Sequence, residues 1–119
     1  MADGTSVVPS AADVRAGVVL WLRLPASDTS GDAGKTLDMV VASAVSFVAG
    51  LPIAQRTDTA AADSIALGTI MLAARLVRRR NSPGGIEAMT ESGAAYVART
   101  DSDVSRLLGL DQFQAPMIG

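Results

Sequence analysis

The segment GDAGKT at residues 31–36 is the first part of this 119-residue chain whose residue types suggest ligand binding. It matches the end of a phosphate-binding loop, in which backbone N–H groups at a helix N-terminus hold a phosphate. The full pattern has a further glycine where this chain has Thr29. No later apolar run ends in an aspartate that would hold magnesium. We therefore interpret the segment as a loop that leads into a helix, and we expect no nucleotide cofactor.

Four arginines form a second candidate site: Arg75, Arg78, Arg79 and Arg80. They lie where a long apolar helix is predicted to end, and positive charge there complements the negative end of the helix dipole. Consecutive residues of a helix point in different directions, so one partner does not bind all four side chains. Three uses stay open: a solvated helix end, ion pairs with a neighbouring protein chain, and contacts with DNA phosphates.

The carboxylates offer little catalytic or metal-binding chemistry. Asp101 and Asp103 stand at the start of the predicted last helix, where negative charge is favourable. Glu87 and Glu91 are interpreted as solvated. The chain has no cysteine and no histidine, which excludes disulfides, Cys/His zinc sites and imidazole or thiolate catalysis. Its net charge of −2 argues against binding nucleic acid through overall basicity. We expect no enzyme activity, no cofactor and no metal.

The elements that position these residues begin with a helix after Ser10. Ser10 and Asp13 have the capping pattern of a helix start, and residues 1–9 are expected to be loose. The apolar residues Val14, Val18, Trp21 and Leu22 follow at helical spacing. Residues 18–24 are also rich in strand-forming types, so helix and strand both stay open there. Trp21 is expected to anchor the core, as is Phe47 of the next helix.

Two longer helices are predicted in the middle of the chain, at residues 36–49 and 59–80, and a turn-rich loop at 25–35 precedes them. The first buries one face, formed by Leu37, Val40, Val41, Ala44, Phe47 and Val48. The second is apolar around most of its circumference, apart from a stripe through Ser64, Gly68, Arg75 and Arg79. Such a helix must be covered on most sides. It is either the central helix of a bundle or a core helix that also contacts another subunit.

The C-terminal third has a hairpin-like pattern at residues 87–100, with a turn at Ser92-Gly93. A short last helix follows from Thr100 to Leu108 and is closed by Gly109. The sequence therefore predicts a mainly α fold: a bundle of about four helices in one domain, 1–109, with an extended tail at 110–119. The longest uncharged run, 39–55, is shorter than the roughly 20 apolar residues of a membrane span. No membrane association is expected.

Residues 71–110 carry a resemblance to a known family. Its features are the apolar helix that ends in Arg78–Arg80, then Asn81-Ser82-Pro83, Arg99-Thr100-Asp101-Ser102-Asp103 and Leu107-Leu108-Gly109-Leu110. Two earlier segments, ADVR at 12–15 and LRLP at 22–25, are similar to the first helix of the same family and to the end of that helix. With these features the chain resembles the head-to-tail connector (adaptor) proteins of long-tailed bacteriophages, especially those that infect actinobacteria.

The resemblance implies a structural virion protein without catalysis. Such subunits assemble into a ring, commonly twelve-fold, that docks beneath the portal, extends the DNA channel and receives a stopper or tail-completion protein. Genomic DNA would pass through without specific binding. The expected location is the head–tail interface of the virion, after synthesis in the host cytoplasm. The residues expected at subunit or portal contacts are Arg75, Arg78, Arg79, Arg80, Tyr96, Arg99, Phe113, Pro116 and Met117.

A second class of function also follows from the arginines alone. A small DNA-binding regulatory protein would use the cluster from Arg75 to Arg80 to contact phosphates, and its affinity would fall steeply with salt.

Overall fold

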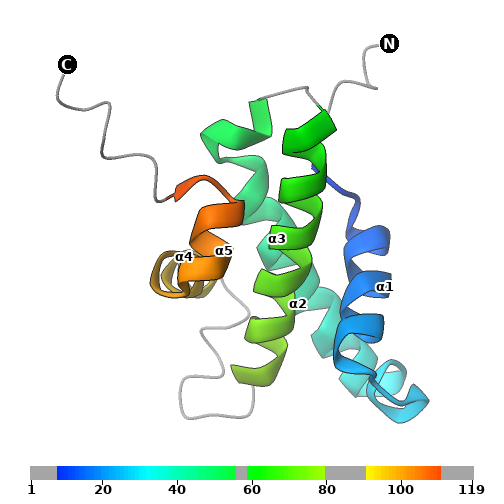
Figure 1. Cartoon of the computed structure of the whole chain (residues 1–119). Helices are drawn as coiled ribbons and strands as arrows, with labels where there is room; N and C mark the ends of the chain where they lie inside the picture. The colour runs from blue at the N-terminus through cyan, green and yellow to red at the C-terminus, as the bar shows by residue number, and fades with distance from the viewer. Residues whose placement is uncertain (1–7, 56–58, 80–90, 111–119) are drawn as a thin grey trace, which may run out of the picture.

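Helix α3 (Thr59–Arg79) is the central element of the structure and packs against all four other α-helices (Figure 1). These are α1 (Ala11–Leu22), α2 (Gly31–Ala49), α4 (Glu91–Thr100) and α5 (Ser102–Leu107). Two short 3-10 helices, η2 (Ala26–Asp28) and η3 (Pro52–Gln55), follow α1 and α2. The computed structural model describes residues 8–55, 59–79 and 91–110, and none of these residues is in a strand. The prediction of a small, mainly helical bundle is confirmed.

The helices are arranged around α3 on three sides. Figure 1 shows α1 on one side of α3, α4 and α5 on the opposite side, and α2 crossing behind. Helix α2 contacts α1, α3 and α4, and so joins the two sides. The first and last parts of the described chain are therefore separated by the central helix.

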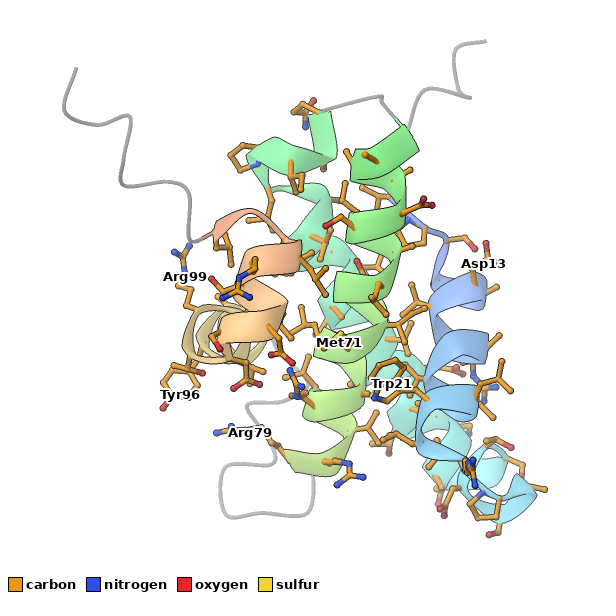
Figure 2. All side chains as sticks on the ribbon, viewed as in Figure 1. Asp13, Trp21, Met71, Arg79, Tyr96 and Arg99 are labelled. Atoms are coloured by element: carbon orange, nitrogen blue, oxygen red, sulfur yellow. The ribbon has the colours of Figure 1, made fainter. Side chains whose placement is uncertain are left out.

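Helix α1 includes residues 18–22, so the strand alternative for this part is wrong. The Asp13 N–H donates to the Ser10 hydroxyl at 3.1 Å, which caps the helix start as predicted. The helix ends at Leu22 because Arg23 adopts a left-handed backbone, with φ of 54°. Val14 and Val18 are fully buried, but Trp21 is 52% exposed. The expectation that Trp21 anchors the core is wrong, because its side chain lies at the surface beside α3 (Figure 2).

Helix α2 begins at Gly31, five residues before the predicted start at Thr36. Its predicted apolar face is confirmed: Leu37, Val40, Val41, Ala44, Phe47 and Val48 are all buried. The loop between α1 and α2 is correspondingly shorter and contains the turn η2. The helix starts early because Ser30 is its N-cap residue. The backbone of Ser30 is extended, and its carbonyl oxygen accepts the first helical hydrogen bond, from the Gly34 N–H at 3.0 Å.

Helix α3 is covered mostly by its own chain. Ile65, Thr69, Leu72 and Leu76 are fully buried. Gly68 of the predicted polar stripe is buried too, because Leu107 and Leu108 of α5 pack over it. Residues Ala60–Arg79 are long and apolar enough to cross a membrane, yet 56% of that window is buried inside the bundle. This burial is typical of the core helix of a bundle.

Helix α4 replaces the hairpin that was predicted for residues 87–100. Residues 91–100, including Ser92-Gly93, are helical, and residues 87–90 lie outside the described part. Ala94, Val97 and Ala98 are buried at helical spacing, and alanine favours a helix over a strand. Helix α5 and its closure at Gly109 (φ 77°) agree with the prediction. Two predicted segments lie mostly outside the described residues. Of the N-terminal segment 1–9 the structure describes only residues 8 and 9, and of the tail 110–119 only Leu110.

The substitution Leu72→Asp should unfold the bundle. Leu72 has no exposed surface, and an unpaired charge at such a position costs about 3–5 kcal/mol, a large part of a small domain's stability. Thermal unfolding followed by circular dichroism measures the loss. Met39→Asp is the matched control, because Met39 is 54% exposed and its substitution should shift Tm little. Equal Tm values for the two variants would contradict the central position of α3.

Candidate interaction surface

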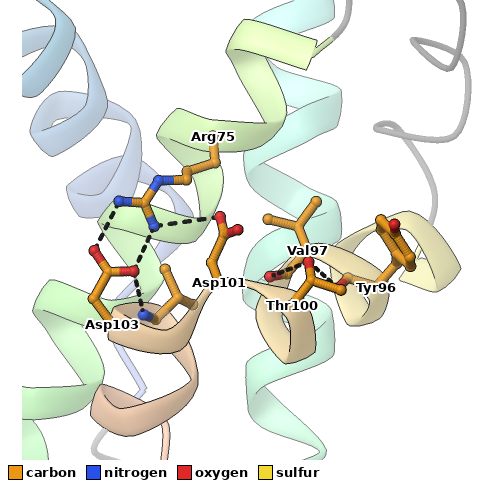
Figure 3. Close-up of polar contacts among 7 residues, drawn as sticks. Arg75, Tyr96, Val97, Thr100, Asp101 and Asp103 are labelled. Carbon is orange, nitrogen blue, oxygen red and sulfur yellow. Dashed lines mark hydrogen bonds and ion pairs between the residues drawn. The ribbon is translucent and has the colours of Figure 1, made fainter.

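Arg75 of α3 is bound within the chain by two aspartates that flank the start of α5 (Figure 3). Its Nη1 and Nη2 donate to Asp103 Oδ1 and Oδ2 at 3.0 and 2.8 Å, and Nη1 lies 3.4 Å from Asp101 Oδ2. This two-point geometry is the strongest form of an arginine–carboxylate contact. The predicted positions of both aspartates at a helix start are confirmed, but their side chains serve to hold α5 on α3.

The Arg75–Asp103 ion pair shifts the protonation of both groups. The hydrogen bond with Asp103 raises the pKa of the Arg75 guanidinium, and the hydrogen bond from Arg75 lowers the pKa of the Asp103 carboxyl. The Val104 N–H donates to Asp103 Oδ1 at 2.9 Å and favours the charged carboxylate further. The side chains are 34% and 51% exposed, so water screens the attraction and the pair is worth only a modest amount of stability.

The other arginines of the predicted cluster do not join Arg75. Arg78 and Arg79 are exposed at the end of α3, and Arg80 lies outside the described residues. The Arg79 guanidinium carbon lies 5.6 Å from the centre of the Tyr96 ring, within range of a cation–π contact. Tyr96 is 60% exposed, and Arg99 is exposed one turn further along α4. We call Arg79, Tyr96 and Arg99 the α4 surface.

A second surface was missed by the sequence analysis. Along α1, the outward positions Ala12, Ala16 and Leu20 recur every four residues and are exposed. Leu20 is 77% exposed and the adjacent Trp21 52%. Asp13, also exposed, adds a negative charge near the start of α1, and the exposed Arg23 adds a positive charge at its end. We call Asp13, Ala16, Leu20 and Trp21 the α1 surface.

The remaining predicted contact residues lie in the tail. Phe113, Pro116 and Met117 are outside the described residues, so their role stays a prediction. Four other predicted contact residues are exposed, as a contact role requires: Arg78, Arg79, Tyr96 and Arg99. Within the described ranges, no group of three or more acidic side chains is arranged to hold a metal ion.

The phosphate-loop pattern at residues 31–36 has a packing role. The segment is the first part of α2, and Gly34 is buried against the preceding turn. A Cβ atom at Gly34 would stand 2.6 Å from the Thr29 carbonyl oxygen. That oxygen accepts from Arg15 Nη2 at 2.7 Å, and Arg15 Nε donates to Asp38 Oδ1 at 2.6 Å. The glycine therefore lets the turn close on α2 while Arg15 joins it to α1.

Comparison with protein-family models, with curated proteins and with solved structures found no significant match. A functional proposal therefore depends on the resemblance carried by residues 71–110 and on the two surfaces described above.

Asp103→Asn should lower stability at neutral pH by about 0.5–1 kcal/mol, the value of an exposed ion pair. Because folding lowers the pKa of Asp103, its contribution is complete above the ordinary carboxyl pKa of about 3.9 and is lost as pH falls through the lower folded value. Urea unfolding at several pH values should show the difference from wild type at pH 7 and its loss under acid conditions. Asp63→Asn, at an exposed position on α3, is the control. A constant difference down to the lowest pH would contradict the ion pair.

Gly34→Ala should destabilise the protein by about 1–3 kcal/mol, because the new methyl group meets a backbone carbonyl that cannot move without losing its bond to Arg15. Gly17→Ala is the matched comparison. Its Cβ would stand 2.5 Å from Ile70 Cδ1 and 2.8 Å from Ile70 Cγ1. A side chain can shift more easily than a backbone carbonyl, and alanine favours the helix by about 1 kcal/mol, so Gly17→Ala should cost less than Gly34→Ala. Denaturant unfolding measures both. If Gly34→Ala left the free energy of unfolding unchanged, the packing role of this glycine would be contradicted.

Proposed function

We propose that this protein is a structural virion component, the head-to-tail connector of a long-tailed bacteriophage. Its subunits form a ring beneath the portal, extend the DNA channel and present a platform to a stopper or tail-completion protein. In this role DNA passes through without being held, and no reaction is catalysed.

The observation that carries the proposal is the contact between the two halves of the resembling segment. Arg75 belongs to the apolar helix, and Asp101 and Asp103 belong to the Arg99–Asp103 motif. Leu107 and Leu108, from the third motif, pack over Gly68 of the same helix. Five residues of the resembling segment thus meet around α3, and this supports their assignment to one structural unit: Arg75, Asp101, Asp103, Leu107 and Leu108.

The distribution of exposed residues also supports a ring component. A cyclic ring is built by heterologous contacts, in which one surface of a subunit meets a different surface of the next. The α1 surface and the α4 surface differ in composition and lie on opposite sides of α3 (Figure 2). A subunit of this form has two surfaces available for neighbours on either side.

The alternative is a small DNA-binding regulatory protein. It gains support from Arg78, Arg79 and Arg99, which are exposed. It loses support from Arg75, whose charge is compensated by two aspartates of the same chain. Phosphate binding depends on the number of cations that can contact the backbone of the DNA, and fewer contacts give weaker binding.

Electron microscopy of the purified protein, alone and mixed with the portal protein of the same phage, tests the connector proposal. Rings or ring-shaped additions to the portal are expected. Duplex DNA is the control ligand, and it should bind no more than weakly at physiological salt. A protein that stays monomeric beside the portal would contradict the connector role. Tight duplex binding that weakens steeply with salt would favour the regulatory alternative.

A further inference from the structure

We propose that helix α5 opens away from α3 as a unit while α1, α2 and α3 stay packed together. We call α5 with the residue that follows it, Leu108, the α5 latch. The inference is independent of the connector role and concerns a motion of the chain itself. It rests on the kind of contacts that hold this short segment on the central helix.

Helix α5 is too short to be stable without its neighbours. It has six residues, and isolated helices shorter than about 12 residues are marginal in water because the first turn fixes several residues for one hydrogen bond. Its N-cap residue, Asp101, makes no side-chain hydrogen bond to the helix start, and the carboxylate lies 3.4 Å from Arg75 Nη1 instead. The helical form of α5 therefore depends on its packing against α3 and α4.

The apolar part of that packing is small. The α5 latch buries Val104 and Leu108, and Leu108 lies over Gly68 of α3, where a Cβ atom would stand 2.9 Å from Leu108 Cδ2. Helices α1, α2 and α3 share a much larger interior, whose large, fully buried side chains are Val14, Val18, Leu37, Val40, Val41, Val48, Ile65, Leu72 and Leu76. Because hydrophobic stabilisation grows with the apolar area buried, the latch is held less strongly than these three helices hold one another.

The polar contacts of the latch are replaceable by water. The side chains of Arg75, Asp101 and Asp103 are all partly exposed, so their ion pairs are screened (Figure 3). The Ser64 hydroxyl donates to the Leu107 carbonyl, and both groups can bond to water once the helices separate. Segments held by few buried apolar side chains and by exposed polar contacts open with a lower free energy than the interior of a protein.

Opening of the latch changes what α3 presents to its surroundings. The close approach at Gly68 ends, so that part of α3 becomes accessible. Arg75 loses both of its carboxylate partners and its charge is no longer compensated. The latch is thus a conformational device that covers one face of the central helix and masks one arginine.

Residue-resolved hydrogen exchange of the full-length protein, measured by NMR at several low concentrations of denaturant, tests this motion. The reporters in the latch are the amides of Ser105 and Leu108, which donate to the carbonyls of Asp101 and Val104. The reference is the slowest amides in the middle of α2 and α3. After correction for intrinsic rates, the latch amides should exchange at least about tenfold faster than the reference, with a weaker dependence on denaturant.

Two substitutions of fully buried leucines give the matched comparison. Leu108→Asp should remove the protection of the Ser105 amide while the α2 and α3 amides stay protected and the cooperative thermal transition remains, because an open latch takes the new charge into water. Leu72→Asp, the control, should abolish protection throughout. The inference is overturned if Leu108→Asp unfolds the whole chain as Leu72→Asp does, or if it leaves the Ser105 amide protected. Equal exchange free energies for the latch and the reference amides in the wild type would overturn it too.

Discussion

The structure depends on covering one helix that is apolar around most of its circumference. Helix α3 has to be surrounded, since each uncovered leucine or isoleucine would forgo about 1.5–3 kcal/mol of burial. The chain does this with four helices, and two glycines allow the closest approaches. Gly17 of α1 lies under Ile70, and Gly68 of α3 lies under Leu107 and Leu108 of α5. A side chain at either position would require its neighbour to move.

The position of the exposed surfaces follows from this arrangement. Helices α1 and α4 cannot pack against each other because α3 and α2 lie between them, and each keeps an outward face. Helix α5 has only six residues and little surface of its own, so the ion pair from Arg75 and the leucines over Gly68 fix it in place. The interior of the bundle thus determines which residues remain for contacts with other molecules.

Much of the fold could be predicted from hydrophobic spacing, and the errors have physical causes. The buried face of α2 and the limits of α3 were predictable because their apolar residues recur over several turns. Helix α4 was mistaken for a hairpin since it is short and carries Ser92-Gly93, a pair common in turns. The start of α2 was placed too late because Gly31 and Gly34 are typical of loops, and only the contact with Thr29 explains Gly34 in a helix.

The candidate site was predictable in its residue types but not in its geometry. Trp21 follows Val14 and Val18 at helical spacing, yet burial ends at the margin of the α1–α3 contact and leaves half of the ring exposed. Leu20 follows the buried Val18 by two residues, about 200° around the helix, and its outward position agrees with the helical spacing. Which helix covers which face depends on crossing angles and on close approaches such as that of Gly17, and these are properties of the packed bundle.

The arginines illustrate why a cluster in sequence is not a cluster in space. Successive residues of a helix are rotated by about 100°, so Arg75, Arg78 and Arg79 face different neighbours. Arg75 meets the aspartates of α5 and Arg79 meets Tyr96, whereas Arg78 is exposed at the helix end. A phosphate-binding surface would need several of these charges to point the same way. Arg75 instead stabilises the packing of α5 on α3, and Arg79 lies beside the exposed ring of Tyr96. This arrangement suits contact with protein better than contact with DNA.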